Sequence, residues 1–159
     1  MLAAVTLYSL SVFVHVTAVV VGLGATFAES LLFPVAMRAG TRHLAYVHRV
    51  QLAINQRLAT PALGVIVLTG IYQTIDGDWG FGSFWISATF AIVIVIGAIN
   101  GAYFIPTDRR LAAMAEREQG GERLSDEYQS AARREGMMGA VTGILVILAI
   151  FLMVTKPGA

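Results

Sequence analysis

Four long apolar stretches restrict what this chain can fold into. They lie near residues 5–28, 58–75, 84–105 and 137–155, and each is close to the ~20 residues that cross a hydrocarbon core as a helix. Charged residues make up only 13% of the sequence, about half of their share in a water-soluble domain. Backbone groups in lipid must be hydrogen-bonded within the protein, and the alternating pattern of barrel strands is missing. We therefore predict an all-α fold, an integral membrane four-helix bundle.

The polar segments between the apolar stretches also have helical features. Ser125 is suited to cap the last helix, Thr107 is suited to begin a separate helix, and Gly120–Gly121 is expected to break that helix. We therefore predict helices extended into the cytoplasm, within a single transmembrane domain over residues 1–159. The predicted helices lie near residues 5–37, 42–75, 84–118 and 125–155.

The arginines are confined to two of the connections, and their distribution predicts the orientation. The connection between the first and second helices carries four arginines and no acid, and the one between the third and fourth carries six. The intervening connection, DGDWGFGS, contains Asp76 and Asp78 without a base, and the C-terminal segment has only Lys156. By the positive-inside rule, both arginine-rich connections face the cytoplasm and both termini lie outside.

His15 is the first candidate for chemistry, because it lies about 16 Å along the first apolar helix, near the middle of the bilayer. Tyr8, His15, Gly22 and Glu29 recur every seven residues and share one stripe of the helix. One interpretation is a helix–helix seam, in which small residues allow close packing and the imidazole donates to a neighbouring carbonyl. The alternative is a metal site, in which His15 ligates haem iron while Ala18 and Gly22 leave room for the macrocycle.

Glu29 and Arg57 are expected at a similar level near the inner boundary of the membrane. One interpretation is an ion-paired anchor, and we predict that Glu29 pairs with at least one arginine, Arg57 being the first choice, because an unpaired carboxylate facing lipid is costly. The functional alternative is a polar vestibule in which Arg57 receives an anionic group such as a porphyrin propionate. Both interpretations place Glu29 facing protein rather than lipid.

Several other functions receive no support from the sequence. The chain contains no cysteine, which excludes disulfides, thiolate metal sites and iron–sulfur clusters. His43 and His48 are five residues apart, about 140° around a helix, so we expect surface positions rather than a paired metal face. Nucleotide-binding and hydrolase motifs are missing. The basic connections are explained by topology and lipid headgroups, so membrane lipid is the expected partner and no nucleic acid is expected.

Three segments together carry a family resemblance: FVHVTAVVVGLGATF, RLATPALGVIVLTGIY and ILAIFLMVTKP. They resemble a group of small bacterial membrane proteins that includes HemJ-type protoporphyrinogen oxidases, CopD-type copper-resistance proteins and predicted integral membrane proteins. We expect the chain to belong with the last branch. The resemblance implies a four-helix haem-binding protein of the bacterial inner (plasma) membrane, with His15 at the position of the haem-binding histidine. It also matches Arg57, Leu58, Pro61 and Gly70 to the pattern of the second helix.

The chain also departs from the HemJ pattern. Its third apolar stretch, FWISATFAIVIVIG, lacks the lysine of those proteins, and Glu29, Ser30 and Pro34 occupy the region where an arginine is expected. The resemblance therefore extends to haem binding more readily than to protoporphyrinogen oxidation. If the protein is an enzyme, it implies a haem-dependent oxidoreductase similar to protoporphyrinogen oxidase.

The favoured hypothesis is a membrane protein that binds haem b through His15 for electron transfer or a haem-related redox step. The second axial ligand stays open between Met153, a His15 of another protomer in a homo-oligomer, and none. The redox partner is not specified by the sequence. The competing hypothesis is a haem-free membrane module that acts as a small transporter or an assembly subunit.

Overall fold

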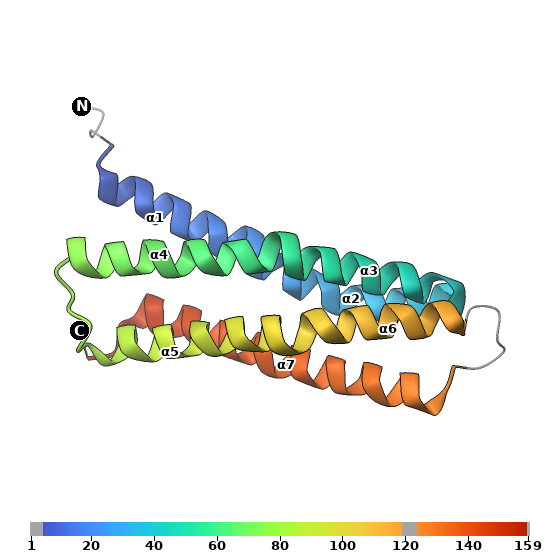
Figure 1. Cartoon of the computed structure of the whole chain (residues 1–159). Coiled ribbons are helices and arrows are strands. Elements are labelled where there is room, and N and C mark those ends of the chain that lie inside the picture. The colour runs from blue at the N-terminus through green and yellow to red at the C-terminus, as the bar shows by residue number, and fades with distance from the viewer. Residues whose placement is uncertain (1–4, 119–123, 159) are drawn as a thin grey trace.

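Four long helices form an antiparallel bundle in the computed structural model, which describes residues 5–118 and 124–158 (Figure 1). All four are long and apolar enough to cross a membrane. They span Leu7–Ala39, Thr41–Asp76, Phe84–Arg117 and Asp126–Thr155, so each end lies within two residues of its predicted position. The prediction of an all-α membrane bundle is confirmed.

Three of the four long helices are interrupted by a π-helical turn, at Val19–Leu23, Asn55–Ala59 and Asn100–Phe104. Such turns are frequent at functional sites, because the inserted residue changes the direction of the following side chains. The elements in chain order are α1 (Leu7–Ala18), η1 (Val19–Leu23), α2 (Gly24–Ala39), η2 (Thr41–His43), α3 (Leu44–Ile54), η3 (Asn55–Ala59), α4 (Thr60–Asp76), α5 (Phe84–Ile99), η4 (Asn100–Phe104), α6 (Ile105–Arg117) and α7 (Asp126–Thr155).

The predicted helix ends are correct at Ser125 and wrong at Thr107. The Ser125 hydroxyl accepts a hydrogen bond from the Tyr128 backbone N–H at 3.2 Å and caps α7. Thr107 lies inside the continuous helix Phe84–Arg117, because Pro106 is tolerated in the first turn of α6 after η4 and the chain does not need to restart. The predicted break at Gly120–Gly121 lies outside the described residues.

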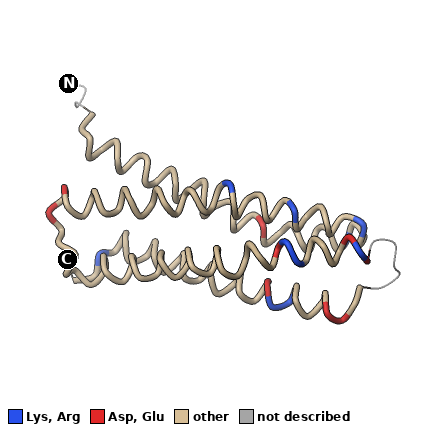
Figure 2. Tube along the Cα trace, viewed as in Figure 1, with Lys and Arg blue, Asp and Glu red and all other residues tan. Residues whose placement is uncertain are grey.

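The bundle has two halves, which differ in what surrounds them. We call the part built from α2, α3, α6 and the first part of α7 the arginine-rich half, because basic residues gather mainly there (Figure 2). The part built from α1, α4, α5 and the last part of α7 is the terminal half, because both termini lie at its end (Figure 1). Helices of 30 to 36 residues are about 45–54 Å long, which exceeds the ~30 Å of a hydrocarbon core.

The arginine-rich half has a core like that of a soluble protein. Leu44, Leu111 and Tyr128 are fully buried there, from α3, α6 and α7 respectively. In the terminal half, by contrast, large apolar side chains cover the outside, and Val20, Leu68, Ile94, Ile144 and Phe151 are all more than half exposed. Such a surface suits lipid rather than water.

Candidate functional site

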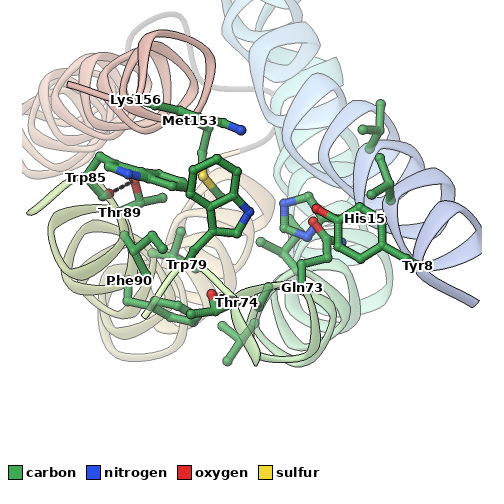
Figure 3. A pocket seen from close by; sticks show the side chains of 17 residues that line it. Tyr8, His15, Gln73, Thr74, Trp79, Trp85, Thr89, Phe90, Met153 and Lys156 are labelled. Atoms are coloured by element: carbon green, nitrogen blue, oxygen red, sulfur yellow. Dashed lines mark hydrogen bonds between the residues drawn. The ribbon is translucent and has the colours of Figure 1, made fainter. Parts of the chain in front are cut away.

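A cavity of about 180 Å³ lies in the terminal half, between α1, α4, α5 and α7. In Figure 3 the side chains of Tyr8, His15 and Gln73 lie on one side of this cavity, and those of Met153 and Lys156 lie on the other. The cavity is therefore formed by residues that are far apart in the sequence. We call it the His15 cavity.

The hydrogen bonds of Thr69 determine which ring nitrogen of His15 carries the proton. The Thr69 hydroxyl is 2.6 Å from the Val65 carbonyl oxygen, to which it donates. The same hydroxyl oxygen is 2.8 Å from His15 Nδ1, so it accepts from an Nδ1–H. In the neutral imidazole, Nε2 then has no proton and offers a lone pair. Fixing one ring nitrogen so that the other is free is how proteins orient a metal-binding histidine.

Aromatic side chains and one cation form the opposite wall of the cavity. The rings of Trp79 and Trp85 meet edge to face at 5.6 Å between centroids. The Lys156 ammonium lies 4.2 Å from the centroid of the Trp79 ring, an attractive cation–π arrangement. Lys156 is held there because it ends α7 in the left-handed conformation, with φ of 45°. The wall therefore combines flat apolar surfaces with a positive charge.

The structure does not bring Ala18, Gly22 and Arg57 to this cavity. Ala18 packs against the buried apolar cluster of the terminal half. A Cβ on Gly22 would lie 2.2 Å from the Ala62 Cβ, so Gly22 permits the close crossing of the first two long helices and leaves no free space. Arg57 is exposed, within η3. Gly70 is the glycine that faces His15, because a Cβ placed on Gly70 would lie 3.7 Å from His15 Cε1.

A second cavity, of about 500 Å³, lies toward the arginine-rich half and is lined by Glu29, Gln51, Asn55, Asp108 and Glu135, among others. We call it the carboxylate cavity. Glu29 faces protein there, as expected. Its predicted pairing with Arg57 is wrong, because Glu29 Oε1 is buried without a hydrogen-bond partner among the described residues while Arg57 is exposed.

The surface position expected for His48 is also wrong. His43 is exposed, but His48 is fully buried and its Nε2 lies 2.7 Å from the Tyr128 hydroxyl. Asp108 was not singled out by the sequence, although it is 1% exposed. Asp108 lies in the first turn of α6, directly before Arg109 and Arg110. Because these two arginines occupy the exposed face of an amphipathic helix, Asp108 is expected on the opposite, buried face.

The family model for predicted integral membrane proteins (DUF2269) matches residues 9–157. The chain therefore belongs to this family. Searches of curated proteins and of solved structures give no match. The grouping with HemJ-type and CopD-type proteins stays a resemblance.

Proposed function

We propose that this integral membrane protein binds haem b through His15 and takes part in electron transfer or a haem-related redox step. The observation that carries the proposal is the hydrogen bond between His15 Nδ1 and Thr69 Oγ1, 2.8 Å long, which leaves the Nε2 lone pair available to iron. The resemblance to haem-binding membrane proteins points independently to the same residue.

The residues around the His15 cavity have the chemical character that a porphyrin needs. Gly70 gives the imidazole room on α4, the tryptophans provide apolar surfaces, and Lys156 offers a cation to a propionate. The volume of about 180 Å³ accommodates only part of a macrocycle. The rest requires α1 to move outward, which is feasible because α1 packs mainly on α4 and much less on α5 or α7.

Each residue has a distinct role in this proposal. The bound haem would supply a one-electron redox centre. Thr69 fixes the tautomer and orientation of His15, and the surrounding apolar side chains exclude water and so influence the potential of the iron. Met153 lines the same cavity and is our proposed second ligand. A His15 of another protomer, or no second ligand, are the alternatives.

The proposed reaction class is narrower than that of the resembling proteins. The helix α5 contains no lysine, and Glu29 and Ser30 stand near the inner end of the first long helix, where HemJ-type proteins have an arginine. We therefore propose haem binding without protoporphyrinogen oxidation. Arg57, first proposed to receive a propionate, is exposed, and Lys156 takes that role.

The proposed orientation places the arginine-rich half in the cytoplasm and both termini outside, in the inner membrane. The chain has no natural cysteine, so Gly82→Cys, where an added Cβ meets nothing within 4 Å, and Gly120→Cys each introduce a single labelling site. An impermeant maleimide added to intact cells is expected to label the first variant and spare the second. The reverse pattern would contradict the orientation.

The test of haem binding compares wild type with His15→Ala, purified from haem-sufficient cells at equal folded yield. Wild type is expected to show a Soret band that shifts on reduction, and His15→Ala is expected to lose it. His43→Ala is the matched control, because His43 is exposed and its loss should leave the spectrum unchanged. Equal haem content in wild type and His15→Ala would return His15 to a packing role.

A second candidate function is a haem-free membrane module, acting as a small transporter or an assembly subunit. The observation that favours it is the carboxylate cavity, which is larger than the His15 cavity and lined by acidic side chains. A colourless wild-type preparation from haem-sufficient cells would favour this module.

A further inference from the structure

Three buried side chains in the arginine-rich half converge from three helices. They are His48 of α3, Asp108 of α6 and Glu135 of α7, which are 0%, 1% and 8% exposed. One potential ligand atom from each lies within 4.8 Å of the other two. This cluster is separate from the His15 cavity, whose lining residues include none of the three.

Several polar atoms of the cluster have no hydrogen-bond partner within the described chain. Asn55 Nδ2 donates to Asp108 Oδ2 at 2.9 Å, but Asp108 Oδ1 and Glu135 Oε1 have no partner among the described residues. His48 Nδ1 is also without a hydrogen bond and lies 3.9 Å from Glu135 Oε2. A histidine nitrogen and two carboxyl groups therefore face one another, and each of these groups has an atom without a hydrogen-bond partner in the described chain.

Two further buried oxygen atoms near the cluster also lack a hydrogen-bond partner among the described residues. Gln51 Oε1, one turn from His48, and Glu29 Oε1, on the wall of the carboxylate cavity, are both buried without a partner in the described chain. Burying such groups unsatisfied costs free energy. A proton shared between two carboxyl groups satisfies only one pair of atoms, whereas a cation satisfies several acceptors at once.

No basic side chain supplies that positive charge within residues 5–118 and 124–158. Two ion pairs of the described residues, Arg49 with Glu116 and Arg110 with Glu127, lie at the surface, and all four side chains are exposed. Arg134, next to Glu135 in the sequence, is also exposed. Among the described residues, Asp108 and Glu135 therefore form no ion pair with an arginine or lysine.

Tyr128 holds His48 in the orientation that a ligand requires. The Tyr128 hydroxyl is fully buried and lies 2.7 Å from His48 Nε2. When Nε2–H donates to this oxygen, Nδ1 keeps the lone pair, and Nδ1 is the ring nitrogen that lies 3.9 Å from Glu135 Oε2. In a metal-bound form the Tyr128 oxygen would then fix the ring by accepting from the other nitrogen.

We propose that His48, Asp108 and Glu135 bind a divalent first-row transition metal ion, with Gln51 and Glu29 able to complete its coordination. One imidazole among carboxylate oxygens suits Mn²⁺, Fe²⁺ or Zn²⁺ better than a soft metal. Donors that share a metal at about 2.1 Å are about 3 Å apart. Small side-chain rotations close the difference from the 3.9 Å between His48 and Glu135.

The test measures binding of Mn²⁺ to the full-length protein in detergent, from the free Mn²⁺ signal in electron paramagnetic resonance, with Zn²⁺ as a competitor. Wild type is expected to bind one Mn²⁺ per chain. Glu135→Gln and Asp108→Asn keep the shape of the side chain but remove a metal ligand. Each should raise the Kd for Mn²⁺ by at least roughly 10- to 100-fold, because even the loss of a group that is hydrogen-bonded to a ligand has an effect of that size. Tyr128→Phe should raise it by about 10-fold.

Glu116→Gln is the matched control, because this acid lies at the exposed surface and its loss should leave Kd unchanged. Two outcomes would overturn the proposal. One is equal Mn²⁺ affinity in wild type, Glu135→Gln and Asp108→Asn, which would show binding elsewhere. The other is no saturable Mn²⁺ or Zn²⁺ binding by folded wild type, which would show that the carboxyl groups are kept neutral by protons.

Discussion

The two halves of the bundle are built from the same four long helices but hold a histidine in different ways: His15 is half-buried and His48 is fully buried. In the terminal half, His15 shares its Nδ1 proton with Thr69 and faces aromatic side chains and Met153. In the arginine-rich half, His48 is bound to Tyr128 and faces carboxylates. The first setting suits a large, mostly apolar cofactor, and the second suits a compact cation. The neighbours of each imidazole therefore determine which kind of ligand the histidine is suited to bind.

The halves also differ in what holds them together. The arginine-rich half buries leucine and tyrosine side chains in a core like that of a soluble protein, so the hydrophobic effect stabilises it wherever water surrounds it. In the terminal half lipid is as apolar as the side chains, and stability must come from close packing and hydrogen bonds between helices.

Leu111→Ala is expected to lower the free energy of unfolding by about 2–5 kcal/mol, because Leu111 is fully buried in the core of the arginine-rich half. Leu68→Ala in the terminal half should change it by only about 0.5 kcal/mol, because Leu68 is 69% exposed and faces lipid. Denaturant titration of both variants in the same micelles measures the difference. Equal destabilisation would remove the distinction between the halves.

Gly22→Ala is expected to lower stability by about 1–3 kcal/mol. The added Cβ would lie 2.2 Å from that of Ala62 and push the first long helix away from α4. Gly64→Ala is the control, since a Cβ there meets nothing within 4 Å and should be neutral or slightly stabilising. Thermal melts of the two variants give the comparison, and a stable Gly22→Ala variant would show that this crossing is not tight.

Thr69→Val is expected to weaken haem binding by about 10-fold, because His15 loses the acceptor that fixes its tautomer. Haem titration of apoprotein, followed by the Soret band, measures the change. Thr142→Val is a suitable control, since Thr142 donates to the Met138 carbonyl within α7 and does not line the His15 cavity. Unchanged affinity in Thr69→Val would mean that this hydrogen bond does not prepare His15 for iron.

Glu29→Gln is expected to raise the melting temperature of metal-free protein by about 2–4 °C, which corresponds to about 1 kcal/mol. The substitution removes an acidic group that is buried without a partner in the described chain. Arg57→Gln should leave the melting temperature unchanged, because Arg57 is exposed. If both substitutions lowered the melting temperature by similar amounts, and their effects were not additive in the double variant, Glu29 and Arg57 would form an ion pair after all.

The long helices were predictable because length and apolar character are local properties of the sequence. The cap at Ser125 follows for the same reason, since its partner is three residues away. The burial of His48 was not predictable, because Tyr128 is 80 residues further along the chain. The position of Arg57 was misjudged because it lies in the π turn η3, where the regular helical spacing does not hold.

The candidate site was predictable only in part. His15 stood out because a polar ring in an apolar helix is rare, but its partner Thr69, 54 residues away, left no signal in the sequence. Gly22 was interpreted as space for a cofactor, whereas the structure uses it for helix contact. A glycine in a helix indicates that another group comes close, but not whether that group is a cofactor or a neighbouring helix.

We propose that the two halves bind different ligands independently of each other. The most direct test measures haem and Mn²⁺ stoichiometry on the same purified samples of wild type, His15→Ala and Glu135→Gln, loaded with Mn²⁺ and matched for folded yield. We expect His15→Ala to lose haem and keep Mn²⁺, and Glu135→Gln to lose Mn²⁺ and keep haem. Loss of both ligands together in either variant, or of neither in both, would contradict the account.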